Sequence, residues 1–128
     1  MNWWWMNLAR SLGFEIESFG GEALQFKEDL SISSICTVFT ESEVTSLIAK
    51  GHSPQDIAMG LHKSVINRVA GIIKRVSGKG DMVCTGGVAH NQCRQQLLAE
   101  ILDREVLVPE NPQLVGALGA SLLARGAA

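Results

Sequence analysis

The stretch MVCTGGVAHNQC, residues 82–93, decides how this chain is interpreted. A short apolar run ends at Thr85, two glycines follow, and the next residues open onto a helical pattern. Glycine loses more backbone entropy on folding than any other residue, so two in succession need a reason. One reason is a tight turn between a strand and a helix. The other is a ligand that comes very close to the main chain, and the pattern alone leaves both open.

The elements predicted around this turn favour an α/β fold. Strands are predicted at 82–85 and 106–108, on either side of a helix at 88–102. Before them we expect a helix at 3–12, a weak helix at 22–27, an extended segment at 32–39 and a helix at 40–50; a last helix starts at Asn111-Pro112. Alternating helices and strands are typical of a layered α/β domain, so we expect residues 1–128 to form one domain.

Two helix starts are marked clearly. Ser53 and Pro54 are a cap followed by proline, and they begin the longest predicted helix. One apolar stripe is expected along it, made of Ile57, Leu61, Val65, Val69, Ile72 and Val76. Thr40 and Glu43 have the spacing of a capping box at the start of the preceding helix.

Composition excludes several classes of protein. A chain of 128 residues with 46% hydrophobic and 19% charged residues can bury a core of ordinary size. The net charge of −2 gives no indication of a nucleic-acid partner, and no apolar run approaches the roughly 20 residues of a membrane span. Three cysteines argue against a secreted disulfide framework, so we expect a cytoplasmic location.

Residues 86–87 are the first candidate site. A strand, two glycines and a helix would place unpaired amides and a positive dipole end at the carboxyl edge of the sheet. Without side chains there, a flat base or a phosphate could contact the main chain. A tight turn without a ligand is the alternative.

The cysteines and histidines give weaker indications. Cys84, His90 and Cys93 follow no common zinc spacing, and no fourth ligand is evident. Cys36 lies at an element boundary, where it is either an exposed thiolate or a small buried hydrophobe. We expect His52, like His62, to lie on the surface. Of the three consecutive tryptophans at 3–5, at least one should be exposed and could bind a partner.

Four blocks together carry a resemblance to a known family. They are ICTVFTESEVTSLIAKG (35–51), IAMGLHKSVINRVAGI (57–72), CTGGVAHN (84–91) and VPENPQLVGALGASLLA (108–124). In this order they resemble the C-terminal half of the BadF/BadG/BcrA/BcrD-type ATPases. That family contains the activators of 2-hydroxyacyl-CoA dehydratases and the ATPase subunits of benzoyl-CoA reductases. The resemblance extends from about residue 7 to the end of the chain.

The resemblance implies an actin-like fold, as in sugar kinases and chaperone ATPases, with ATP or ADP and Mg²⁺ between two domains. It implies that Gly86, Gly87 and Val88 contact the adenosine, with Gln113 near the base. It also implies a homodimer with one [4Fe-4S] cluster on its axis, for which Cys36 would be a metal ligand. Glu43 would help to connect the nucleotide cleft with the cluster. ATP hydrolysis would drive an electron to a dehydratase or reductase partner.

The sequence also departs from the family pattern. The loop with the first cluster cysteine, expected just before residue 1, and the N-terminal domain with its phosphate loop are both missing from this sequence. We therefore expect this chain alone not to hydrolyse ATP and to hold an incomplete cluster. The alternative is a catalytically inert fragment that acts as a dimerisation module through its tryptophan helix. A carbohydrate-kinase-like domain is a third possibility, which residues 36–44 disfavour.

Overall fold

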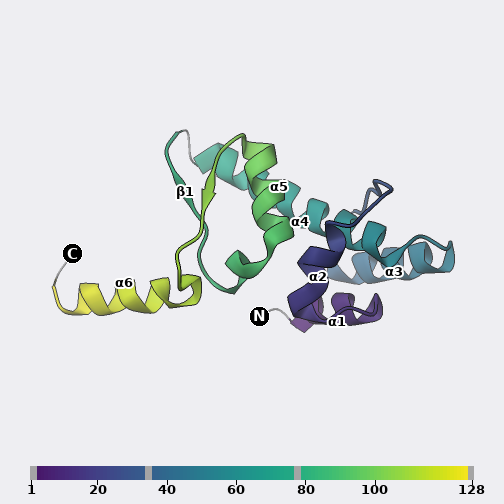
Figure 1. Cartoon of the computed structure of the whole chain (residues 1–128), viewed down its shortest axis with the longest axis horizontal. Helices are drawn as coiled ribbons and strands as arrows, with labels where there is room; N and C mark the ends of the chain where they lie inside the picture. The colour runs from purple at the N-terminus through teal and green to yellow at the C-terminus, as the bar shows by residue number, and fades with distance from the viewer. Residues whose placement is uncertain (1–2, 34–35, 77–78, 127–128) are drawn as a thin grey trace.

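One long helix, α4 (Pro54–Val76), runs through the middle of the computed structural model (Figure 1). It starts where the cap predicts, because Ser53 Oγ accepts a hydrogen bond of 3.2 Å from the amide of Asp56. Asp56 Oδ1 in turn accepts bonds from the amides of Lys27 and Glu28, at 2.8 and 3.0 Å. The first turn of α4 therefore also fixes a loop that lies 28 and 29 residues earlier in the chain.

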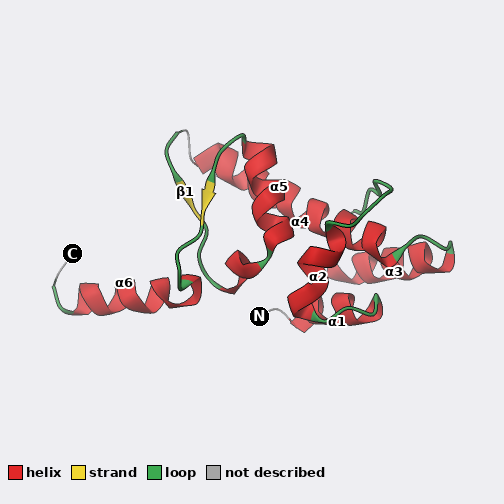
Figure 2. Cartoon of the chain, in the orientation of Figure 1, coloured by secondary structure: helices red, strands yellow, loops and turns green. Residues whose placement is uncertain are grey.

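The structure describes residues 3–33, 36–76 and 79–126. This part of the chain is mostly helical, with one sheet of two strands (Figure 2). The other elements are α1 (Trp3–Ser11), α2 (Ile16–Ala23), α3 (Thr37–Ala49), β1 (Met82–Val83), the 3-10 helix η1 (Gly87–His90), α5 (Gln92–Leu102), β2 (Val106–Leu107), the 3-10 helix η2 (Pro112–Leu114) and α6 (Val115–Ala124).

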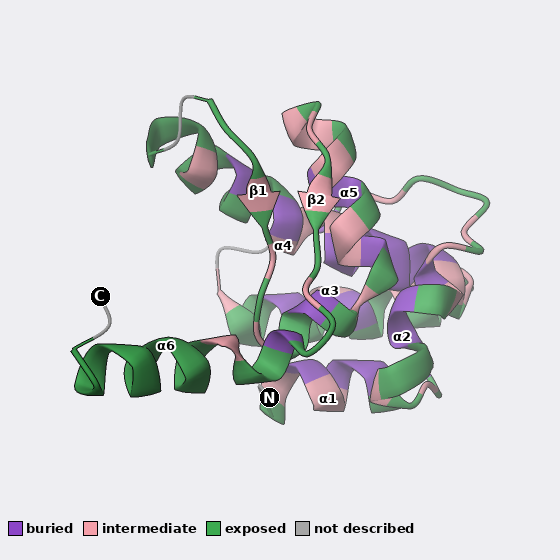
Figure 3. Ribbon diagram, turned by 60° about the vertical axis from the view of Figure 1, so that its left-hand side comes forward, coloured by how far each residue is buried: buried purple, intermediate pink, exposed green. Residues whose placement is uncertain are grey.

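The core lies among the helices. Side chains from α1, α2, α4 and α5 meet there, and α3 adds Val44. The largest fully buried side chains include Phe19, Ile57, Leu61 and His62. Each apolar side chain of this size contributes about 1.5–3 kcal/mol when it is removed from water. Figure 3 shows this core as the buried stretches of these helices.

The sheet is small. β1 and β2 pair in parallel, with Met82 opposite Val106 and Val83 opposite Leu107. Parallel strands need a crossover, and η1 with α5 supplies it, so residues 82–107 form one β-α-β unit. The expected alternation of strands and helices is confirmed here, although each strand is shorter than predicted.

The C-terminal helix has a different environment. α6 extends away from the other helices (Figure 1), and every one of its residues is at least partly exposed. Leu118 and Leu123 remain 59% and 66% exposed. Figure 3 shows α6 as exposed along nearly its whole length. The described part of the chain therefore leaves a strongly apolar helix without cover.

Several predicted boundaries are wrong. The first short helix after α1 is α2, which ends at Ala23, so the helix expected at 22–27 lies too late. The segment expected to be extended at 32–39 is helical from Thr37, since the backbone amide of Thr40 donates the first helical hydrogen bond, of 3.0 Å, to the carbonyl of Cys36. Residues 34–35 of that segment lie outside the described residues. The helix expected at 88–102 is divided at Asn91.

The apolar stripe on α4 is correct only in its first half. Ile57 and Leu61 are fully buried, whereas Val69, Ile72 and Val76 are increasingly exposed. The buried face of the second half runs instead through Ile66 and Ala70, with Ile73 partly buried against the core. No helix in the described ranges is both long and apolar enough to span a bilayer.

Candidate functional site

The glycine turn after β1 is open. Gly86 has φ +82° and ψ −179°, a conformation that only glycine adopts readily. Gly87 has no positive φ, and a Cβ placed there would meet only Gln113 Nε2, at 3.5 Å. A Cβ on Gly86 would meet nothing within 4 Å. A tight turn thus explains Gly86, but the backbone does not explain why residue 87 lacks a side chain.

A second segment lies against this turn. The amide of Gly86 donates a 2.7 Å hydrogen bond to the carbonyl of Pro112, at the start of η2. The turn and η2 are therefore neighbours, although they are far apart in sequence. The structure brings Gly86, Gly87 and Gln113 together in this way, and Val88 follows them with half of its surface exposed.

The helix dipole expected at the glycine turn lies further along the chain. The residues after Gly86 form the four-residue η1, and α5 starts only at Gln92. Asn91 caps α5, because its side-chain Oδ1 accepts a hydrogen bond from the amide of Arg94 at 3.0 Å. The turn therefore presents exposed main chain and open space to a ligand. It does not present the N-terminus of an α-helix.

Cys36 and Glu43 lie at the start of α3. Cys36 is half-buried and is the residue before the first turn of this helix. Glu43 Oε2 accepts a 3.0 Å bond from the amide of Ser33, in the segment that leads to Cys36. Glu43 thus supports the cysteine segment, and the predicted capping box with Thr40 is wrong. A link from Glu43 to the nucleotide remains a prediction.

The cysteines and other candidate metal ligands lie apart in the described part of the chain. The described residues contain no group of three or more His, Cys, Asp or Glu side chains that could hold a metal ion. Cys36, Cys84 and Cys93 are free thiols. Burial raises the pKa of Cys93 to about 11, and it also raises the pKa of Cys84. Cys36 alone does not fit a four-iron cluster, which needs four ligands.

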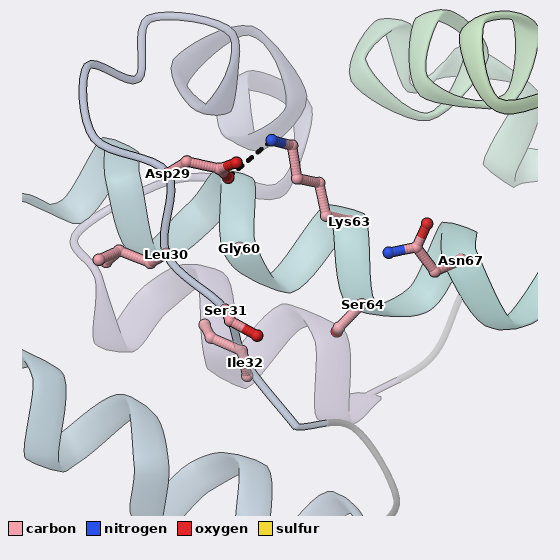
Figure 4. Close-up of a pocket in the computed structure, with 8 residues that line it drawn as sticks. All are labelled: Asp29, Leu30, Ser31, Ile32, Gly60, Lys63, Ser64 and Asn67. Atoms are coloured by element: carbon pink, nitrogen blue, oxygen red, sulfur yellow. Dashed lines mark hydrogen bonds and ion pairs between the residues drawn. The ribbon is translucent and has the colours of Figure 1, made fainter.

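Between described residues outside the glycine turn, two further cavities can be located. One of about 240 Å³ lies between residues 29–32 and α4, beside an ion pair of 2.7 Å between Lys63 Nζ and Asp29 Oδ1 (Figure 4). The chain comes very close to α4 here, since a Cβ on Gly60 would lie 3.0 Å from the carbonyl oxygen of Leu30. The second cavity, of about 610 Å³, lies along α6 and η2. No sequence pattern indicated either cavity.

The predicted surface location of His62 is wrong. The residue is fully buried in α4. Burial lowers its pKa to about 4, so its ring is neutral at physiological pH. A signal was present in the sequence, because His62 lies next to Leu61 and four residues before Ile66, on the buried face of the helix. His52 is partly exposed, and its Nδ1 lies 3.6 Å from Glu28 Oε2.

The tryptophan triplet behaves as expected. Trp3 is 73% exposed, Trp4 is partly buried and Trp5 belongs to the core. The ring of Trp5 also lies under the guanidinium of Arg94, 4.2 Å from its Cζ. The triplet therefore anchors α1 and leaves one indole available to a partner.

Comparison with known proteins gives a consistent result. Residues 4–124 match the BadF/BadG/BcrA/BcrD ATPase family. The chain is 38% identical over 117 residues to the 2-hydroxyisocaproyl-CoA dehydratase activator of Clostridioides difficile, covering 91% of this chain and 44% of the relative. It is 47% identical over 95 residues to the (R)-2-hydroxyglutaryl-CoA dehydratase activating ATPase of Acidaminococcus fermentans, covering 74% and 36%.

Solved structures agree with these relatives. The activator of the 2-hydroxyisocaproyl-CoA dehydratase from Clostridium difficile, with bound ADPNP, has a TM-score of 0.86 and 37% identity over 94% of this chain and 45% of its own. The expected actin-like ATPase fold is thus confirmed. The chain spans less than half the length of these relatives. It belongs to the BadF/BadG/BcrA/BcrD ATPase family.

Proposed function

We propose that this chain forms the adenosine side of the nucleotide site in an ATP-dependent activator of a 2-hydroxyacyl-CoA dehydratase or a benzoyl-CoA reductase. The observation that carries the proposal is the open turn at Gly86 and Gly87, in a chain that matches the ATPase family over residues 4–124. A nucleoside could lie on the main chain of these glycines, against Val88, with Gln113 beside the base. The ADPNP bound to a relative of this fold supports this choice of ligand.

The chain alone should bind a nucleotide weakly. Stabilisation of a transferring phosphoryl group needs a phosphate loop, a metal ion and charges on both sides of the nucleotide. The described residues offer no metal-binding group, and the chain covers less than half of each relative. ATP hydrolysis and electron transfer to the dehydratase or reductase would therefore require the rest of the family fold.

The apolar surface of α6 supports the proposal that the rest of the family fold packs against this chain. A helix with no buried residue is unusual beside a packed core, and β1 and β2 leave both sheet edges unpaired within the described chain. The N-terminal domain of the family fold would cover such a surface. We propose the cytoplasm as the location of the complete assembly.

Cys36 would contribute one ligand to a [4Fe-4S] cluster in a homodimer. Two copies of this chain provide only two such thiols, so the remaining ligands must come from the rest of the protein. After anaerobic reconstitution of this chain, iron analysis and visible absorption should show no stable cluster. A stable cluster at one per dimer would contradict this part of the proposal.

Calorimetric titration tests the nucleotide proposal. Adenosine, ADP and ATP should bind this chain with affinities that agree within about threefold, because the phosphates gain few contacts. Tight binding that selects ATP over ADP would show that the chain holds a phosphate site of its own, and no binding of adenosine would remove the proposal.

A second candidate function is a non-enzymatic interaction module. The exposed ring of Trp3 favours it, because a large aromatic side chain at the surface is typical of a binding patch. Light scattering after size-exclusion chromatography would separate the two: substitution Trp3→Ala should abolish self-association if the tryptophan helix is the contact. Nucleotide binding should be unchanged.

A further inference from the structure

The side chain of Asn91, directly after η1, is contacted at both ends of its amide. Its Oδ1 accepts the amide hydrogen of Arg94, at 3.0 Å. Its Nδ2 lies 3.0 Å from Nε2 of the buried His62, on α4. A side chain whose donor and acceptor are both engaged has one orientation, so Asn91 links the first turn of α5 to the middle of α4.

The tautomer and the charge of the His62 ring suit a hydrogen bond from Asn91 Nδ2. The Nδ1 atom of His62 lies 2.7 Å from the carbonyl oxygen of Ala58, which can only accept, so Nδ1 carries the hydrogen. In the neutral ring Nε2 is then an acceptor, as the Nδ2 donor of Asn91 requires. Burial keeps the ring neutral, since it lowers the pKa of His62 to about 4. The positive charge of Arg94, on the same helix as the cap, acts in the same direction.

Gly20 provides the space for this side chain. A Cβ on Gly20, in α2, would lie 2.6 Å from Asn91 Oδ1 and 2.9 Å from its Cγ. The next residue, Gly21, has nothing within 4 Å of the same position. Of two adjacent helical glycines, one is therefore required by contact with Asn91 and the other is not.

The ring of His62 cannot easily move. Its edge contacts involve Trp5 of α1 and Phe19 of α2, with ring centroids 5.0 and 4.8 Å away. These aromatic contacts are close to perpendicular, at 78° and 64°. Three helices of the core thus hold the nitrogen atom to which Asn91 donates.

We propose that Asn91, held by His62 in the space left by Gly20, positions the glycine turn at residues 86–90. Few side chains of this turn pack into the core: Ala89 is buried, while Gly87, Val88 and His90 are exposed. At one end of the turn, the backbone amide of Gly86 donates a hydrogen bond to the carbonyl of Pro112. At the other end, the backbone amide of Asn91 donates one of 3.0 Å to the carbonyl of Val88. Asn91 is a positioning residue. Its relevance to a nucleoside rests on the function proposed above.

Gly20→Ala and Gly21→Ala form a matched pair for the test. Both changes add one methyl group to the same helix, but only the first displaces Asn91. In Gly20→Ala we expect hydrogen exchange at the amides of Ala89 and Asn91 to accelerate about tenfold, which corresponds to the loss of one hydrogen bond. The ¹⁵N resonance of His62 Nε2 should move towards that of a ring without a donor. Gly21→Ala should leave both observables unchanged.

A second pair keeps the test valid if Gly20→Ala does not fold. His62→Gln retains a polar group that can accept near the position of Nε2, whereas His62→Leu does not. The turn amides should stay protected in the first variant and lose protection in the second. Equal loss of protection across the whole protein in both variants, or an unchanged turn in Gly20→Ala, would overturn the inference.

Titration with adenosine on the same samples separates this inference from the proposed function. The wild-type amides at residues 86–88 should shift on addition of adenosine, and Gly20→Ala should weaken the binding about tenfold. If the wild type does not respond, the nucleoside proposal fails, while the exchange data still decide whether Asn91 positions the turn. If Gly20→Ala loosens the turn and binds equally well, the positioning role for the ligand is wrong.

Discussion

Apolar side chains are mostly buried in the helical core of this molecule and mostly exposed in its C-terminal arm. The core consists of α1 to α5 and buries Phe19, Ile57 and Leu61 completely. The arm consists of β1, β2, η2 and α6, and it leaves Leu118 and most other apolar side chains exposed. The core therefore has its packing partners within this chain. Met82 and Val106 of the two strands still pack against that core, whereas α6 buries none of its described residues.

The largest effect should come from the core. Phe19→Ala removes a fully buried ring that contacts Trp5 and His62. We expect the free energy of unfolding to fall by about 3–5 kcal/mol, measured by urea denaturation. A loss below about 1 kcal/mol would mean that the core is loosely packed, and the contrast with the arm would disappear.

The pH dependence should also come from the core. His62 has a folded pKa of about 4, against an ordinary value of 6.5, so between these pH values the unfolded chain binds a proton that the folded chain does not. Stability is therefore complete above pH 6.5 and falls by roughly 3 kcal/mol as the pH decreases to 4. His62→Gln should remove this slope. Parallel curves for both proteins would show that His62 is not the responsible group.

The thiols allow a smaller comparison of the two regions. Cys93 is fully buried and lies 4.0 Å from the sulfur of Met59, whereas Cys84, at the end of β1, is half-buried. Alkylation followed by mass spectrometry should modify Cys84 at least about tenfold faster than Cys93. In concentrated urea the two rates should become similar. Equal rates in the native protein would contradict the assignment of Cys93 to the core.

The smallest effect should come from the arm. Leu118→Ala shortens an exposed side chain on α6, so the free energy of unfolding should change by no more than about 0.5 kcal/mol. The same urea experiment as for Phe19→Ala measures it. A loss comparable to that of Phe19→Ala would show that α6 packs against the core, and the arm would need a new explanation.

The sequence predicted what local chemistry determines. The cap at Ser53 and the proline after it placed the start of α4 correctly. Prediction from the sequence failed where a residue far along the chain determines the local structure. The helix expected at 22–27 forms earlier, as α2, and runs through Gly20, where a Cβ would collide with Asn91, a residue 71 positions further along the chain. The position of His62 beside Leu61 indicated the buried face of α4, but its partner Asn91, 29 residues away, could not be predicted from the sequence.

The sequence pattern indicated the turn at Gly86 and Gly87 as a candidate site, and only the family resemblance added Val88, Gln113 and an adenosine ligand. Gly86 and Gly87 look equivalent in sequence, and only their backbone angles separate the one required by the turn from the other. The proximity of Gln113 to Gly87 depends on the bond between Gly86 and Pro112, which no local pattern reveals. The contact with a nucleoside, the role of Glu43 and the cluster ligation by Cys36 stay predictions.

Photoaffinity labelling tests the central claim most directly. The chain would be irradiated with 8-azidoadenosine, and the modified residues would be located by mass spectrometry, with excess adenosine as competitor. The account predicts labelling at Val88 or Gln113, beside the bare main chain of Gly87, and its loss in the presence of adenosine. Labelling that is confined to the cavity beside Lys63, or that adenosine does not reduce, would contradict it.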